Sequence, residues 1–114
     1  MKNLKAIKRK KEMIAIMILA IKNNEKAILK VGNYDIKNKS DEVKFQEDRL
    51  SVLNWCDNKT EKQIQAKIKR LEKTLSVDEL KCKYGTVKGL SIETVLIISK
   101  IELLEVAINK WGEK

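Results

Sequence analysis

The chain has 114 residues, 43% of them apolar and 36% charged, and its 25 Lys and Arg outnumber 16 Asp and Glu for a net charge of +9. This length suits a single domain, and the apolar share is too high for a disordered chain. The absence of His excludes Ser-His and Cys-His nucleophile pairs and every zinc site that needs imidazole. Cys56 and Cys82 cannot form a four-thiolate zinc site within one chain, so we expect no enzyme activity, no metal and no cofactor.

The first distinctive segment sets basic residues 8–11 before the nine apolar residues Met13 to Ile21. A spanning helix needs about twenty apolar residues, so this segment is too short to cross a bilayer. A signal peptide is disfavoured because Glu12 interrupts the boundary and no small-residue cleavage site follows Ile21. We therefore predict a core segment in a cytoplasmic protein with reduced thiols and no membrane span.

Two structures fit the first element. In the helical interpretation, apolar residues recur at three- and four-residue steps from Leu4 to Ile28, and Gly32 ends the helix. In the alternative, residues 13–21 form a buried strand, and residues 29–31 pair with residues 34–36 across a Gly32-Asn33 turn, with Lys30 facing Asp35. We favour the helix because alanines and methionines dilute the β-forming residues.

The later elements have clear boundaries. We predict one helix over residues 41–56, closed by Asp57-Asn58, and another opened by the capping-box spacing of Thr60 and Gln63. A short helix should run from Ser76 to Tyr84-Gly85, and a last helix should cover 92–111, between Ser91 and Gly112. The sequence thus predicts an all-α bundle of four or five helices in one domain, 1–114, with α+β as the alternative if the Gly32-Asn33 hairpin forms.

Two basic clusters are the candidate binding surfaces. The helix after Thr60 has an apolar stripe of Ile64, Ile68, Leu71 and Leu75. Its opposite side, together with the helix start, carries Lys59, Lys62, Lys69, Arg70 and Lys73. A basic N-terminal arm, residues 1–11, carries Lys2, Lys5, Lys8, Arg9, Lys10 and Lys11. Unpaired cations on a rigid face suit phosphate contacts, so we expect a small nucleic-acid-binding or regulatory protein; a solvated helix face and a frayed terminus are the alternatives.

The last predicted helix suggests a different function. Residues 76–100 have the order helix, Gly-containing turn, helix, but residues 92–111 are apolar around most of their circumference and carry Glu102 and Glu105 on the remaining strip. A recognition helix would present basic or polar residues to the major groove. We therefore expect a central helix or a partner-binding one, which makes a protein-protein interaction module (an inhibitor, adaptor or assembly subunit) the rival function and leaves a homodimer open.

The aromatic residues and one acidic group give two weaker signals. The aromatic residues form no cluster interleaved with basic ones, so base stacking on single-stranded RNA is not expected, and Trp55 and Trp111 are predicted core anchors. The acidic group Asp41, Glu42, Glu47 and Asp48 has the residue types for a hard cation, but such groups are typical of helix starts.

Overall fold

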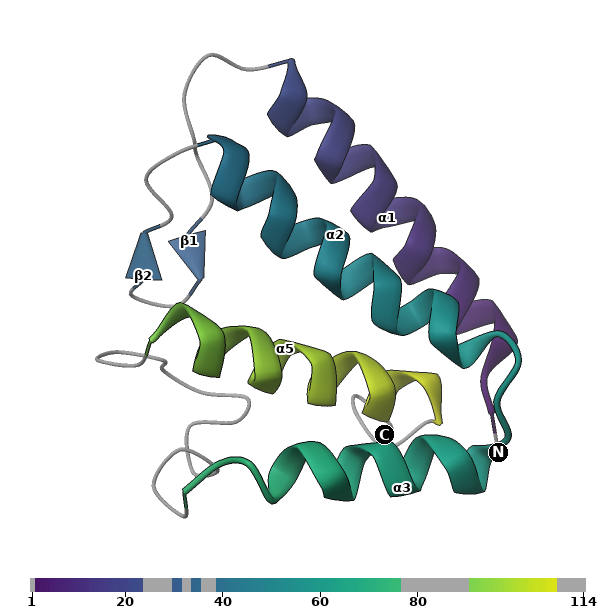
Figure 1. The fold of residues 1–114 in the computed structure, drawn as a ribbon. Helices are drawn as coiled ribbons and strands as arrows, with labels where there is room; N and C mark the ends of the chain where they lie inside the picture. Colours follow the sequence, from purple (N-terminus) through teal and green to yellow (C-terminus); the bar gives the residue numbers. More distant parts are fainter. Residues whose placement is uncertain (1, 24–29, 32–33, 36–38, 77–90, 109–114) are drawn as a thin grey trace.

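The computed structural model describes residues 2–23, 30–31, 34–35, 39–76 and 91–108. These residues form four packed helices, α1 (Leu4–Lys22), α2 (Lys39–Cys56), α3 (Glu61–Glu72) and α5 (Ile92–Ala107) (Figure 1). The predicted all-α helical bundle is therefore confirmed. Among the described helices, none is both long enough and apolar enough to span a bilayer.

The first predicted element is a helix, but it is shorter than expected. α1 begins where the Asn3 side chain accepts a hydrogen bond from the backbone N–H of Ala6 at 3.0 Å, which satisfies a free N–H group of the first turn. It ends at Lys22, before two asparagines, whose side chains compete for backbone hydrogen bonds and disfavour helix. The predicted continuation to a cap at Gly32 is wrong, and so is the alternative of a strand at 13–21.

A short antiparallel hairpin lies between α1 and α2. β1 (Lys30–Val31) pairs with β2 (Tyr34–Asp35), with Lys30 opposite Asp35 and Val31 opposite Tyr34. This is the register that the hairpin interpretation predicted, although the turn at 32–33 lies outside the described residues. Helix and hairpin, expected as alternatives, occupy successive segments. Strands of two residues leave the fold class all-α.

The starts of α3 and α5 confirm the predicted caps. Thr60 and Gln63 form the capping box, with the Thr60 N–H donating to Gln63 Oε1 at 2.8 Å and the Gln63 N–H donating to Thr60 Oγ1 at 3.2 Å. Ser91 Oγ accepts from the Thr94 N–H at 3.2 Å and begins α5. α5 ends at Ala107 rather than at 111. Most of the predicted short helix from Ser76 lies outside the described residues, which omit 77–90.

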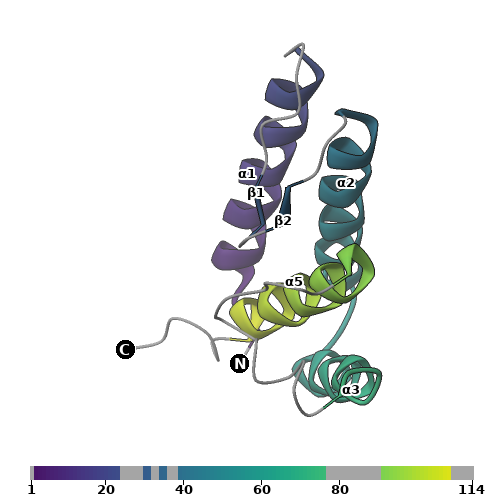
Figure 2. The same ribbon diagram turned by 90° about the vertical axis from the view of Figure 1, so that its left-hand side faces the viewer.

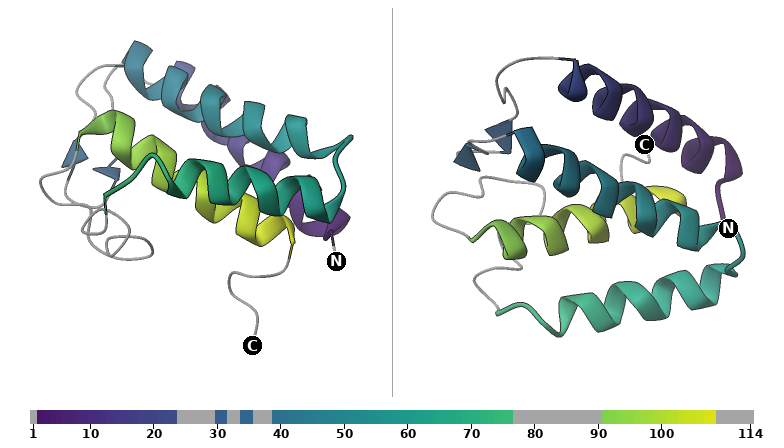
Figure 3. Two further views of the ribbon diagram at one scale, coloured as in Figure 1. Left: turned by 60° about the horizontal axis from the view of Figure 1, so that its bottom comes forward. Right: turned by 45° about the horizontal axis from the view of Figure 1, so that its top comes forward.

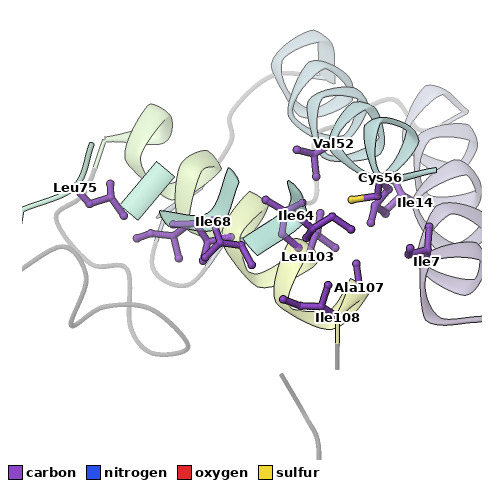
Figure 4. Packing of buried hydrophobic residues seen from close by; sticks show 14 of the residues in the cluster. Ile7, Ile14, Val52, Cys56, Ile64, Ile68, Leu75, Leu103, Ala107 and Ile108 are labelled. Atoms are coloured by element: carbon purple, nitrogen blue, oxygen red, sulfur yellow. The ribbon is translucent and has the colours of Figure 1, made fainter. Parts of the chain in front are cut away.

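The core is organised around α5. α1 and α2 lie side by side, α5 crosses them, and α3 packs on the far side of α5 (Figures 1 and 2). Figure 4 shows buried side chains from all four helices meeting in one apolar cluster. α5 buries apolar residues on most of its circumference: Val95, Ile98, Ile101, Leu103, Leu104 and Ala107. The apolar surface of α5 is therefore mostly buried within the chain, and α5 is the central helix of the bundle.

The apolar segment Met13 to Ile21 is only partly core. Ile14, Ile18 and Ile21 are buried on the inner side of α1, as predicted. Met13, Ile16 and Leu19 point outward instead and are 49%, 66% and 62% exposed. We call these three residues the apolar patch. An apolar run over consecutive positions covers all sides of a helix, so only some of its residues can face a single neighbour.

A buried polar group lies where α2 packs on α5. Glu42 and Gln46, four residues apart on α2, are each 1% exposed. The Arg49 guanidinium donates to Gln46 Oε1 at 2.7 Å. Desolvation by burial lowers the pKa of Arg49, and the negative charge of Glu102 on α5 opposes this shift. The sequence places Glu42 among ordinary helix-start acids, so its burial is a finding of the structure.

The two sides of α1 give a direct test of the packing. Ile18→Asp buries an unpaired carboxylate in the core and should leave the chain unfolded or insoluble. The matched control, Ile16→Asp, alters an exposed position of the same helix and should lower the free energy of unfolding by less than about 1 kcal/mol. Circular dichroism during urea unfolding measures both variants. Equal effects at the two positions would show that α1 is packed differently.

The buried polar group provides a second test. Arg49→Met removes the donor to Gln46 Oε1 and the cation facing Glu102, so it should lower the free energy of unfolding by about 1–3 kcal/mol. Arg70→Met makes the same chemical change at an exposed site on α3, and it should alter the free energy of unfolding by no more than about 0.5 kcal/mol. Urea unfolding of the two variants compares them. A neutral Arg49→Met would show that the group contributes nothing to stability.

Candidate nucleic-acid interface

The outward side of α3 carries the cations that the sequence predicted there. Ile64 and Ile68 are buried against the core and fix the rotation of the helix, and the capping box fixes its start. The opposite side is therefore in solvent. Its four cations are all exposed, and we call them the α3 basic face: Lys62, Lys69, Arg70 and Lys73.

No acid weakens this face locally. The other exposed residues of the stretch 61–74 are Gln63, Ala66 and Thr74. Glu61 and Glu72 are half-buried at its borders, beside the apolar stripe. Lys69 and Arg70 also lie in the last turn of α3, where cations stabilise the negative end of the helix dipole. The face is thus compatible with phosphate binding and with an ordinary amphipathic helix, the two interpretations that the sequence left open.

Lys59, predicted as a phosphate contact, lies elsewhere. Its Nζ is 5.4 Å from the centroid of the Trp55 ring, and the Nζ of Lys67 is 5.2 Å from the same centroid. Each ammonium is attracted by the electron-rich face of the indole, an interaction worth about 0.5–1 kcal/mol near a surface. Trp55 is half-buried and packs against the core, as predicted. Lys67 was not among the predicted cations, and it falls on the flank of α3 rather than on its outward side.

The basic N-terminus is not a flexible arm. Residues 4–11 form the first two turns of α1, and Ile7 is buried in the core. Lys2 Nζ donates to the backbone oxygen of Asp57 at 3.0 Å, and Lys11 Nζ forms a 2.6 Å ion pair with Asp57 Oδ2. The backbone N–H of Asn3 donates to the Ala107 oxygen at 2.6 Å. Contacts to the ends of α2 and α5 hold this segment in place.

The remaining N-terminal cations lie on α1. Lys5, Lys8 and Arg9 are exposed, and Lys10 is half-exposed. α1 and α3 start at the same corner of the molecule and then diverge, with α2 and α5 between them (Figures 1 and 3). The structure therefore brings the starting ends of the two clusters together. Lys69, Arg70 and Lys73 lie toward the far end of α3.

Other kinds of site have little support in the described part of the chain. α5 is too deeply buried to act as a recognition helix in a major groove. Phe45 is buried, so it offers no platform for base stacking. Within the described ranges no group of three or more Cys, Asp or Glu residues could hold a metal ion. Tyr84 and Trp111 lie outside those ranges.

Cys56 is a buried free thiol at the end of α2. Desolvation raises its pKa from the ordinary value of 9.0 to about 11, against the smaller opposing effect of Lys2. The thiolate is the reactive form, so this cysteine is inert near neutral pH. It acts as a small apolar core residue; Cys82 lies outside the described residues.

No protein-family model, curated protein or solved structure matches this chain. Its described side chains are therefore the basis for any functional proposal.

The raised pKa of Cys56 predicts a pH dependence of stability. The unfolded chain releases the thiol proton near pH 9, whereas the folded chain retains it to about pH 11. The free energy of unfolding should therefore hold its full value below pH 9 and fall as the pH rises toward 11. Cys56→Ala removes this titration, and urea unfolding at several pH values should show a shallower fall for the variant. Parallel curves would mean that the thiol is not desolvated.

Proposed function

We propose that the protein binds the phosphate backbone of nucleic acid through the α3 basic face. The observation that supports this is the set of four exposed cations on one helix, with no acid among the exposed residues of 61–74. Each neutralised phosphate releases a counterion, so cations that no carboxylate occupies are the ones that contribute to affinity. The net charge of +9 attracts the same polyanionic partners over a longer range.

A fixed helix suits this task. The core residues Ile64 and Ile68 and the capping box hold α3 in place, so its cations have a defined spacing before any ligand arrives. Phosphate contacts position a protein on a duplex without reading its sequence, and the face carries no set of side chains that would read base edges. Binding should be independent of sequence and steeply sensitive to salt. A reducing compartment such as the cytoplasm suits the free thiol of Cys56.

The N-terminal cations are not part of the proposed phosphate site. Lys2 and Lys11 already contact Asp57, and Lys5, Lys8 and Arg9 lie on a helix that diverges from α3. The rival function, a protein-interaction module that uses residues 92–111, has less support because most apolar residues of α5 are buried within the chain.

The test replaces Lys62, Lys69, Arg70 and Lys73 together by Gln. Gln keeps helix propensity and leaves the apolar stripe untouched, so the fold should survive. Affinity for a short DNA duplex of arbitrary sequence should fall, and the slope of log affinity against log salt should shrink by up to about 0.9 for each phosphate that is no longer neutralised. Fluorescence anisotropy over a series of salt concentrations measures both quantities.

Two controls separate this face from net charge. Lys62→Arg, Lys69→Arg and Lys73→Arg together retain the cations and should keep the parental slope. Lys5→Gln, Lys8→Gln and Arg9→Gln together remove three exposed cations from α1. They should lower the affinity for DNA less, per charge removed, than the changes on α3. Truncating residues 1–11 is unsuitable because it removes Ile7 from the core. No binding by the parent at low salt, or equal losses per charge from both helices, would contradict the proposal.

A further inference from the structure

The outward side of α1 changes character along its length. Its first half carries the exposed cations Lys5, Lys8 and Arg9. Its second half carries the apolar patch, Met13, Ile16 and Leu19, three residues apart and between 49% and 66% exposed. Side chains at three-residue steps lie on one side of a helix, so the patch is contiguous. One exposed acid, Glu12, lies at the boundary between the halves.

The fold does not need these apolar side chains. The inner side of α1 already supplies Ile7, Ile14, Ile18 and Ile21 to the core. Contiguous exposed apolar patches with charged residues at their rim are typical of sites that bind a protein or a membrane. The charges beside the patch then indicate which partner fits.

A second copy of the chain is a poor match. Parallel pairing of two α1 helices would place Lys5, Lys8 and Arg9 against the same cations. Antiparallel pairing about Ile16 would place Arg9 opposite Asn23 of the other copy, beside the exposed cation Lys22. Neither arrangement sets one of the described acidic residues directly opposite these cations. Three partly exposed side chains also bury far less than the roughly 1,000 Å² that a specific protein interface requires.

An anionic bilayer meets both halves of the helix at once. Its headgroups carry negative charge, and the apolar layer begins directly below them. Amphipathic helices bind such surfaces by burying apolar side chains about 5–10 Å into the interface. We infer that the outward side of α1 docks on an anionic lipid surface, with Lys5, Lys8 and Arg9 at the headgroups and Met13, Ile16 and Leu19 inserted between them.

This binding goes beyond the proposed function and uses a different part of the molecule. α2 and α5 separate α1 from α3 over most of their length (Figure 3). The outward side of α1 and the α3 basic face can therefore be occupied together. The inner side of α1 stays packed on α2, so docking requires no unfolding.

Vesicle flotation tests the inference on the full chain. The parent should float with vesicles of phosphatidylcholine containing about one third phosphatidylglycerol, and should bind vesicles of phosphatidylcholine alone much more weakly. Ile16→Gln with Leu19→Gln should lower the partition constant about tenfold or more at unchanged charge. Leu4→Gln is the matched control, because Leu4 is 67% exposed on the first turn of α1 and lies outside the patch; it should bind as the parent does.

The charges give two further expected results. Lys5→Gln, Lys8→Gln and Arg9→Gln should each lower partition onto the anionic vesicles about fivefold. Glu12→Gln removes the acid beside the patch and should raise partition on anionic vesicles alone. The Ile16 and Leu19 changes should have the same effect in the background that lacks the α3 cations, so this result does not depend on whether α3 binds nucleic acid.

Three outcomes would overturn the inference. One is a parent chain that stays unbound with anionic vesicles. Another is a double Ile16 and Leu19 variant, folded by circular dichroism, that binds them as tightly as the parent, since cations alone would then account for binding. The third is a parental dimer in sedimentation velocity that the double variant abolishes, because a second copy would then cover the patch.

Discussion

Burial of α5 is the constraint on which the other described elements depend. Ile101 and Leu104 are fully buried, and α1, α2 and α3 each pack one apolar side against this helix. A helix that is apolar on nearly all sides must be enclosed to keep its surface from water. Enclosing it requires neighbours on several sides, which a small chain provides by folding three helices around one. The outward sides of α1 and α3 are left available for binding as a result.

The net charge of the chain overstates the charge that a ligand would meet. Lys2 and Lys11 contact Asp57 at the end of α2, and Lys59 and Lys67 lie near the ring of Trp55. These cations stabilise the contacts of the end of α2 with α1 and α3. Sequence composition counts them with the exposed cations, although their surroundings differ. Only the exposed cations keep the hydration shell and the side-chain mobility that contacts with a polyanion would use.

Local signals predicted much of the fold. Thr60 and Ser91 begin helices as expected, because a cap depends on residues within one turn. The stripe of Ile64 and Ile68 placed the α3 cations outward for the same reason. The predictions that failed concern features that depend on contacts between residues far apart in the sequence. Periodicity cannot tell which residues of an unbroken apolar run face inward, and the burial of Glu42 depends on packing that forms far along the chain. The Lys11–Asp57 pair has the same origin. The expected arm is part of a helix because Asn3 caps the first turn and Ile7 is buried in the core.

The bond from the Asn3 N–H to the Ala107 oxygen joins the two ends of the described chain. Its consequence appears during synthesis. At roughly 5–20 residues per second, a chain of this length takes about five to twenty seconds to make. α2, the main neighbour of α1, is made directly after it, whereas α5 is made last of the described helices. The bond from Asn3 and the contacts of α1 with α5 can form only once residue 107 has left the ribosome. Until then α2 alone can cover the isoleucines on the inner side of α1.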